Sequence, residues 1–329
     1  MLSSIQITNF RGFENLELKD LGRINLIVGR NNTGKTSLLE AISFVCDPKQ
    51  AGSLPALFRP QWTRQNDARD ARFYRWLLRN GVEDSVIRIN AQTDEGMLRV
   101  AAGKALAGRT KPPDHGLDSP YHLSSQGSVN GSFDYSFQHT QRLVRICNIS
   151  VLHRDSTKLV KDFAEAVRSV SGEQQLETLL RNVDQRIRSV RLDYDRNDSP
   201  QIVIDIGLGE RIPIQQAGQG IYRLIAVYSE MLGQKPDICF IDEIENGLHH
   251  TILPQVWKGI AEAASRLNIQ VFATTHSNEC FVAAHEAFAH REPYDLRVIQ
   301  LYNVDNRIEG RTLGREHIEA AIDGEIDLR

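Results

Sequence analysis

The hydrophobic positions near the start of the chain follow two different periods. Residues 3–10 and 14–21 alternate between apolar and polar side chains, which is typical of half-buried antiparallel strands. Residues 24–28 form a nearly continuous apolar run and predict a fully buried strand. Over residues 37–46 the apolar positions recur at helical spacing, and Pro48 marks the predicted end of that helix.

Buried strands alternate with helices again from about residue 200. The predicted strands are 200–207, 237–243, 269–277 and 297–305, and the predicted helices are 220–232 and 253–267. This alternation indicates a largely parallel sheet that is covered by helices on both faces. We therefore predict an α/β fold.

The middle of the chain has a different character. Its predicted helices are 60–80, 157–170 and 174–190, its strands are 85–92 and 97–104, and its loop is 108–130. We find no repeat of fixed period and no long heptad pattern there. We expect an α/β core formed by residues 1–50 and 200–329, with residues 51–199 inserted as a mainly helical α+β lobe.

Composition narrows the class of protein. The chain has 329 residues, of which 41% are hydrophobic and 25% charged, and its net charge of −3 is typical of a globular protein rather than of a basic nucleic-acid coat. It has no apolar run of about 18 residues and no secretory signal, so we expect a cytoplasmic protein without a membrane partner. The four cysteines have no CxxC spacing, which argues against a zinc site or a redox dithiol.

Residues 29–36, GRNNTGKT, match the P-loop pattern GxxxxGK[ST] between a predicted buried strand and a predicted helix. Gly29 and Gly34 permit backbone angles that let N–H groups point inward and hold phosphate oxygens. Lys35 would place a positive charge on the β- and γ-phosphates of a nucleotide, and Thr36 would offer a hydroxyl to Mg²⁺. The predicted nucleotide-binding residues of this segment are Gly29, Asn31, Asn32, Thr33, Gly34, Lys35, Thr36 and Ser37.

Two further buried strands end in polar residues that suit hydrolysis. After residues 238–241 come Asp242, which can hold Mg²⁺, and Glu243, which can accept a proton from an attacking water. After a later strand comes His276, which would lie over a ligand crevice at the carboxyl end of a parallel strand. We expect its ring to hydrogen-bond the γ-phosphate or the attacking water.

A glycine-rich segment, residues 216–220, precedes the predicted helix at 220–232. Gly218 and Gly220 would expose backbone N–H groups at the amino end of that helix and so form a second phosphate-facing loop. A plain strand-to-helix turn is the alternative.

Together these motifs resemble the ABC-type ATPase head of the SMC, RecF and OLD group. The order is the P-loop, the glycine signature, the acidic strand end, Glu-Asn-Gly-Leu-His at 245–249 and Thr-His-Ser at 275–277. The sequence is most similar to the prokaryotic OLD-like AAA-family ATPases, over roughly residues 1–50 and 200–329. The resemblance implies a P-loop NTPase with a mixed sheet flanked by helices and an α+β insertion between the Walker A and signature motifs.

The resemblance also implies a homodimer that closes around ATP and Mg²⁺. In such heads the signature loop of one subunit contacts the ATP held by the P-loop of the other. Carried over by position, the signature that acts in trans contains Gly218, Gln219 and Gly220, and the metal-binding residues are Thr36 and Asp242. The catalytic base is Glu243, and the switch histidine is His276. The dimer loop contains Glu245, Asn246 and His249, and Arg11 lies near the nucleotide. A solvated turn arginine is the alternative for Arg11.

Two departures from the family bear on the functional hypothesis. Gly218 stands where transporter and SMC heads carry a signature serine, which removes one hydroxyl contact to the γ-phosphate. OLD nucleases carry a Toprim metal domain, whereas 53 residues follow His276 and the aspartates among them form no evident metal cluster. We therefore expect this chain to act as a switch on a separate effector protein, such as a nuclease.

The segment from Arg59 to Arg79 contains six arginines interleaved with aromatic residues. Such a helix could bind the DNA or RNA backbone in a salt-dependent manner. The alternative is an amphipathic helix with its aromatic residues inward and its arginines in solvent or paired with neighbouring aspartates.

The leading functional hypothesis is an ATP-hydrolysing head that dimerises around ATP to regulate an effector or DNA, in antiphage defence or DNA maintenance. One alternative is a nucleotide sensor or scaffold with little turnover, which the glycine at position 218 would favour. Another is a RecF-like DNA-repair ATPase that binds duplex or gapped DNA. A transporter ATPase fits the motifs less well.

Overall fold

The computed structural model describes residues 1–48, 76–82, 84–103, 123–129, 133–139, 144–149 and 156–328. Its central feature is a six-stranded sheet in the order β15-β14-β3-β13-β12-β8. These strands are β3 (Ile24–Val28), β8 (Ile146–Ile149), β12 (Ile238–Ile241), β13 (Gln270–Thr274), β14 (Leu296–Val304) and β15 (Arg307–Leu313). All neighbours pair in parallel except β14 and β15, which are antiparallel. The predicted largely parallel sheet is confirmed.

A second sheet is antiparallel throughout and has the order β2-β1-β4-β5-β7-β6. It contains β1 (Leu2–Phe10), β2 (Phe13–Leu18), β4 (Ile87–Thr93), β5 (Met97–Gly103), β6 (Leu123–Val129) and β7 (Phe133–His139). A small third sheet contains β9 (Ser189–Tyr194), β10 (Pro200–Asp205) and β11 (Ile212–Pro213).

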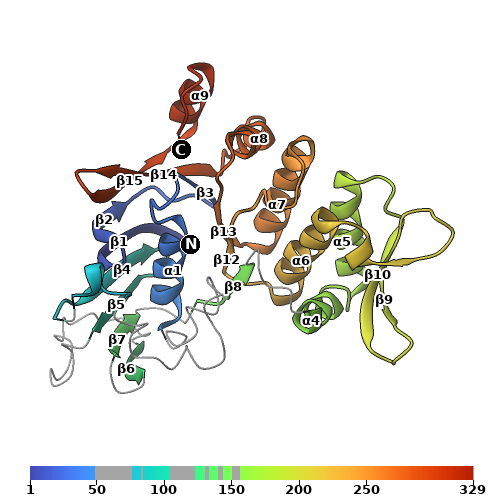
Figure 1. Cartoon of the computed structure of the whole chain (residues 1–329), viewed down its shortest axis with the longest axis horizontal. Helices are drawn as coiled ribbons and strands as arrows, with labels where there is room; N and C mark the ends of the chain where they lie inside the picture. The colour runs from blue at the N-terminus through green and yellow to red at the C-terminus, as the bar shows by residue number, and fades with distance from the viewer. Residues whose placement is uncertain are drawn as a thin grey trace.

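Helices cover the parallel sheet, and Figure 1 shows α1 on the side of the second sheet and α6, α7 and α8 on the other side. The α-helices of the described residues are α1 (Lys35–Cys46), α4 (Ser156–Ala166), α5 (Val170–Val183), α6 (Gln219–Gln234), α7 (Leu253–Leu267), α8 (Asn278–Phe288) and α9 (Arg315–Asp323). Short 3₁₀ turns are η4 (Arg79–Gly81), η6 (Ile214–Gln216) and η7 (His250–Ile252). Among the residues described, no helix combines the length and apolar character needed to span a membrane.

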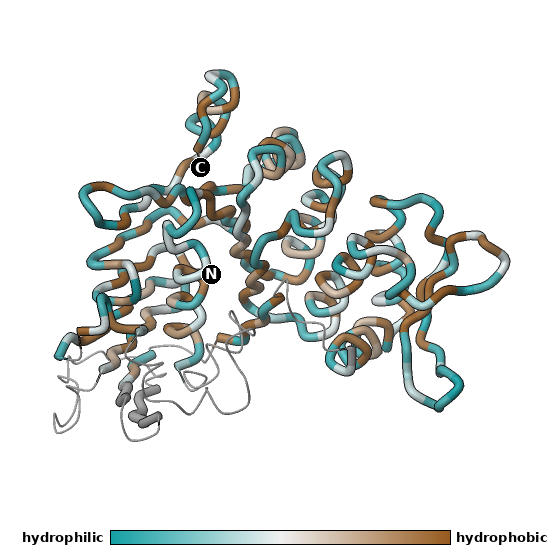
Figure 2. The backbone as a smooth tube through the Cα atoms, viewed as in Figure 1, coloured by the Kyte–Doolittle hydropathy of each residue, from teal (hydrophilic) through white to brown (hydrophobic). Residues whose placement is uncertain are grey.

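Alternating side chains of the parallel sheet enter two different cores. In β12, Cys239 and Ile241 face the core shared with α4 to α8, whereas Ile238 and Phe240 face the core shared with α1 and the antiparallel sheet. Strands that are buried on both faces must be apolar at almost every position. Figure 2 shows this hydrophobic character along the central strands.

The described residues between 51 and 199 are distributed over all three sheets rather than gathered in one lobe. β4 to β7 extend the sheet begun by β1 and β2, β8 forms an edge of the parallel sheet, and β9 pairs with β10. The reason is strand pairing: β1 pairs with β4 in antiparallel register, from Leu2 opposite Thr93 to Thr8 opposite Arg88. Residues 49–75, which hold most of the predicted arginine-rich helix, lie outside the described residues.

Three predicted elements of the middle region have different bounds in the structure. The predicted helix 157–170 ends at Ala166, and the next helix begins at Val170, where the hydroxyl of Ser169 accepts a hydrogen bond from the Gly172 N–H at 3.1 Å and caps α5. The predicted helix 174–190 ends at Val183, and residues 189–194 pair with β10 as a strand. Residues 123–129 of the predicted loop form β6.

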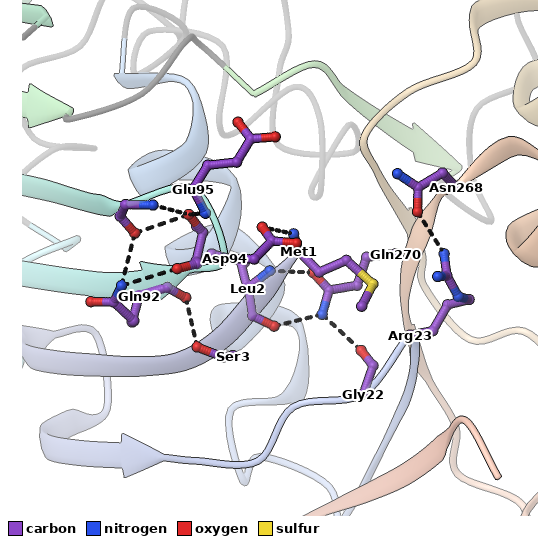
Figure 3. A network of polar contacts seen from close by, with 12 residues as sticks. Met1, Leu2, Ser3, Gly22, Arg23, Gln92, Asp94, Glu95, Asn268 and Gln270 are labelled. Atoms are coloured by element: carbon purple, nitrogen blue, oxygen red, sulfur yellow. Dashed lines mark hydrogen bonds and ion pairs between the residues drawn. The ribbon is translucent and has the colours of Figure 1, made fainter. Parts of the chain in front are cut away.

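The buried amide of Gln270 joins the two large sheets (Figure 3). Its Oε1 accepts from the Leu2 N–H at 2.8 Å, and its Nε2 donates to the carbonyl oxygens of Leu2 at 2.8 Å and Gly22 at 2.7 Å. Because Gln270 lies at the start of β13, these bonds hold the first strand of the antiparallel sheet against the parallel sheet.

We predict that Gln270→Met lowers the free energy of unfolding by about 3 kcal/mol, because it removes the side-chain partner of the buried Leu2 N–H and carbonyl oxygen. Urea denaturation measures the change. Gln92→Met is the matched control, since Gln92 is exposed and bonds only local carbonyl oxygens. Equal stability of the two variants would contradict the prediction.

His139, on β7, is fully buried, and burial lowers the pKa of its imidazole to about 4. Between pH 6.5 and 4 the unfolded chain takes up a proton there that the folded protein does not, so stability falls as the pH falls. Across this pH range the free energy of unfolding changes by about 3 kcal/mol because of this group. We predict that His139→Leu removes this part of the acid sensitivity, measured by denaturation at pH 7 and pH 4.5. His290→Gln, at an exposed position, should leave it unchanged.

Candidate active site

The loop after β3 has the backbone shape that phosphate binding requires. Gly29 and Gly34 have φ angles of 149° and 88°, and Asn32 has a φ of 65°. A Cβ on Gly29 would lie 2.7 Å from Oγ1 of Thr33, so only glycine fits there. Gly34 is the N-cap of α1, which places the loop at the amino end of a helix where backbone N–H groups and the helix dipole favour an anion.

Lys35 is buried beneath this loop. Its Nζ donates to the carbonyl oxygens of Gly29 at 2.6 Å and Arg30 at 3.0 Å. Burial lowers the pKa of the Lys35 amine to about 8, although the charges of Asp242, Glu245 and Glu243 oppose the shift. The amine therefore lies where phosphate oxygens could replace the loop carbonyls as acceptors.

Asp242 lies directly beyond β12 and faces the start of α1. Its Oδ1 accepts from Oγ1 of Thr274 at 2.6 Å, and its Oδ2 lies 3.4 Å from the donor Oγ1 of Thr36. Burial raises the pKa of the Asp242 carboxyl, while the hydrogen bonds from Thr274 and Thr36 oppose the rise. A hydroxyl and a carboxylate are hard oxygen donors of the kind that Mg²⁺ prefers, and a cation would offset the cost of burying this charge.

The next residue, Glu243, turns back toward β13. It has a φ of 47°, which is uncommon for a residue with a Cβ. Its Oε1 lies 3.7 Å from Nε2 of His276, and both side chains are about 40% exposed. The His276 N–H donates to Oε1 of Glu245 at 2.7 Å. Three residues that the sequence analysis selected therefore meet at one edge of the sheet.

A cavity of about 360 Å³ opens beside them. Its lining residues are Gly29, Arg30, Asn31, His276 and Asp327. The P-loop and His276 thus border a common space. Asp327 is one of the aspartates after His276 that form no evident metal cluster in the sequence. No local pattern indicates that it lies at the P-loop, because this placement comes from tertiary packing.

The predicted signature loop lies at the amino end of α6. Gly218 has a φ of 97°, is exposed, and has open space around the position of a Cβ. A Cβ on Gly220 would lie 3.0 Å from the Gly247 carbonyl oxygen, so this loop packs against the 245–248 turn. Gln219 is exposed beside it. The loop does not line the cavity described above.

Asn246 and His249 lie around this turn, and Arg11 lies beside α1. Nδ2 of Asn246 donates to Oε2 of Glu243 at 3.4 Å, and Nδ1 of His249 accepts from the Thr251 N–H at 3.4 Å. Arg11 pairs with buried Glu40 on the second turn of α1, with Nη2 donating to Oε1 at 3.0 Å. Proximity of Arg11 to a nucleotide stays a prediction.

Two side chains that the sequence analysis did not single out hold the 242–243 turn. Thr274 accepts the Glu243 N–H on its hydroxyl at 2.8 Å while it donates to Asp242. Arg223, on α6, donates to the carbonyl oxygens of Asp242 and Glu243. A threonine in a strand and an arginine in an amphipathic helix carry no motif signal, so sequence patterns could not identify them.

Comparison with known families places two matches along the chain. Residues 1–96 match the family described as "AAA ATPase domain". Residues 110–281 match the family described as "AAA domain, putative AbiEii toxin, Type IV TA system".

Individual proteins agree with these matches. The chain is 21% identical to an "ATP/GTP phosphatase" of Helicobacter pylori over the whole of both chains, and 24% identical to an "OLD nuclease" of Thermus scotoductus over 84% of this chain and 59% of the nuclease. Among solved structures, an SMC head bound to the C-winged helix domain of ScpA has a TM-score of 0.61 at 15% identity, covering 98% of this chain and 99% of that one. The predicted P-loop fold and the resemblance to the SMC, RecF and OLD group are confirmed.

We predict that Thr274→Val slows ATP hydrolysis about 10-fold, because it removes the hydroxyl that orients Asp242 and Glu243. Phosphate release under saturating ATP measures the rate. Thr178→Val is the control, since that hydroxyl bonds only the Gln174 carbonyl oxygen within α5. An unchanged rate in Thr274→Val would show that the turn does not need this hydroxyl.

Proposed function

The chain belongs to the AAA-domain family described as "AAA domain, putative AbiEii toxin, Type IV TA system", and on that premise we propose that it is a magnesium-dependent ATPase that dimerises around ATP. The observation that carries this proposal is the convergence of five side chains at the carboxyl edge of the parallel sheet. They are Lys35, Thr36, Asp242, Glu243 and His276.

The chemistry assigned to each group follows from its position. The loop N–H groups and Lys35 bind the phosphates, and Thr36 and Asp242 would hold Mg²⁺. The bound ion would neutralise charge on the phosphate oxygens. Glu243 accepts a proton from the attacking water, and His276, 3.7 Å away, orients that water or the γ-phosphate.

The exposed signature loop supports the dimer. Gly218 and Gln219 project from the amino end of a sixteen-residue helix and do not border the cavity beside their own P-loop. In the proposed dimer their N–H groups contact the nucleotide of the other subunit, with Glu245, Asn246 and His249 at the interface. A two-fold axis then generates two equivalent ATP sites.

We propose that the closed dimer regulates a separate cytoplasmic effector, such as a nuclease, or engages DNA or RNA in antiphage defence or DNA maintenance. An OLD nuclease among the relatives supports an effector of this kind. A sensor with slow turnover is the second candidate, because Gly218 offers no hydroxyl to the γ-phosphate and has open space where a side chain would lie.

We predict that Glu243→Gln binds ATP, loses at least about 100-fold in turnover and accumulates as a dimer, because the carboxamide cannot accept the proton. Light scattering with and without Mg-ATP measures the dimer, and phosphate release measures turnover. Lys35→Ala is the control and should stay monomeric. If Glu243→Gln hydrolyses ATP at the wild-type rate, Glu243 is not the catalytic base. If the wild-type protein shows no turnover that depends on Lys35, the sensor hypothesis is favoured.

A further inference from the structure

We propose that Arg223 is a positioning residue that holds the Asp242–Glu243 turn in its working geometry and couples it to the signature loop of the same subunit. This inference rests on the proposed ATPase function. It concerns a side chain that does not line the cavity but that contacts the backbone of both carboxylate residues.

Arg223 is the fifth residue of α6 and is 9% exposed. One nitrogen of its guanidinium, Nη2, donates to the carbonyl oxygen of Asp242 at 2.7 Å and to that of Glu243 at 2.8 Å. Hydrogen bonds from a charged donor are stronger than neutral ones, and burial strengthens them further. The guanidinium therefore fixes two successive peptide groups.

The turn needs this support because Glu243 has a left-handed backbone. A φ of 47° is unfavourable for a residue with a Cβ, and such a conformation persists only where its surroundings hold it. Thr274 holds the turn from β13 through its contacts to Asp242 and the Glu243 N–H. Arg223 holds it through the two carbonyl oxygens. The Glu243 carboxylate is thus aimed by two elements, of which only α6 carries the signature loop.

Charge supports the same placement. The carboxylates of Glu245, Asp242 and Glu243 are the charged neighbours of the buried guanidinium. A cation in this position offsets the mutual repulsion of three anionic groups near one turn. An apolar side chain of similar length would fill the space but would neither bond the carbonyl oxygens nor balance the charge.

The coupling follows from the rigidity of α6. Gly220 precedes Arg223 by three residues, so both lie on one face of the helix, one turn apart. Positions 219 and 220 also contact 247 and 248, in the segment that follows Glu243. When a partner's nucleotide fixes the 218–220 loop, the first turn of α6 is fixed with it. The position of Arg223, and hence the aim of Glu243, then depends on whether the dimer is closed.

Arg223→Met keeps the aliphatic stem and removes the donors, and Arg223→Lys keeps the charge but loses the planar guanidinium. We expect Arg223→Met to bind a non-hydrolysable ATP analogue within about 3-fold of the wild-type Kd and to dimerise with it, but to hydrolyse ATP about 100-fold more slowly. Arg223→Lys should show an intermediate loss. Arg186→Met, at an exposed arginine that pairs with Asp184, is the matched control and should keep the wild-type rate.

The separation of binding from turnover distinguishes positioning from general stability. A merely structural role would lower melting temperature, analogue binding and dimer formation together with kcat. Such a joint loss would overturn the inference, and so would a wild-type kcat in folded Arg223→Lys. If Arg223→Met fails to fold, the kcat of Arg223→Lys is the deciding measurement. If the wild-type protein shows no Lys35-dependent hydrolysis, the proposed ATPase function fails instead. That result does not depend on how tightly the Arg223 variants bind the analogue.

Discussion

Parallel pairing of β3, β13 and β12 is the constraint on which the rest of the site depends. In this register Ala273 lies opposite both Leu26 and Ile241, so three segments far apart in the sequence end at one edge of the sheet. The P-loop leaves that edge from β3, the two carboxylates leave it from β12, and His276 leaves it from β13. A slip of one residue would send the alternating side chains of β12 into the wrong cores.

The second constraint is electrostatic. A site for a triphosphate needs buried positive charge, and burial makes that charge costly. The structure satisfies Lys35 with two loop carbonyl oxygens and surrounds Arg223 with carboxylates. A phosphate can replace the carbonyl oxygens that contact Lys35. The contacts of Arg223 hold the backbone of the 242–243 turn and stay in place when a ligand binds. In the proposed site, buried cations thus serve two purposes, one toward the ligand and one toward the protein itself.

Local sequence predicted the parts of the site that local chemistry determines. The P-loop, the acidic end of β12 and the histidine after β13 each follow an apolar strand, and the structure brings them together. The helix α7 has the predicted bounds, since its apolar stripe and its ends are both encoded locally. Predictions were less accurate where pairing over long distances decides the outcome: β6 occupies part of a predicted loop, and β9 takes the last two residues of a predicted helix because it pairs with β10. Thr274, Arg223 and Asp327 gain their positions only through tertiary packing, so no motif could mark them.

The central claim is that the loop between β3 and α1 binds the phosphates of ATP. Isothermal titration calorimetry of folded wild-type protein with ATP and Mg²⁺ tests it most directly. The account predicts saturable binding of one ATP per chain that a Lys35→Ala substitution abolishes. Absence of binding to the wild-type protein, or undiminished binding to the variant, would contradict it.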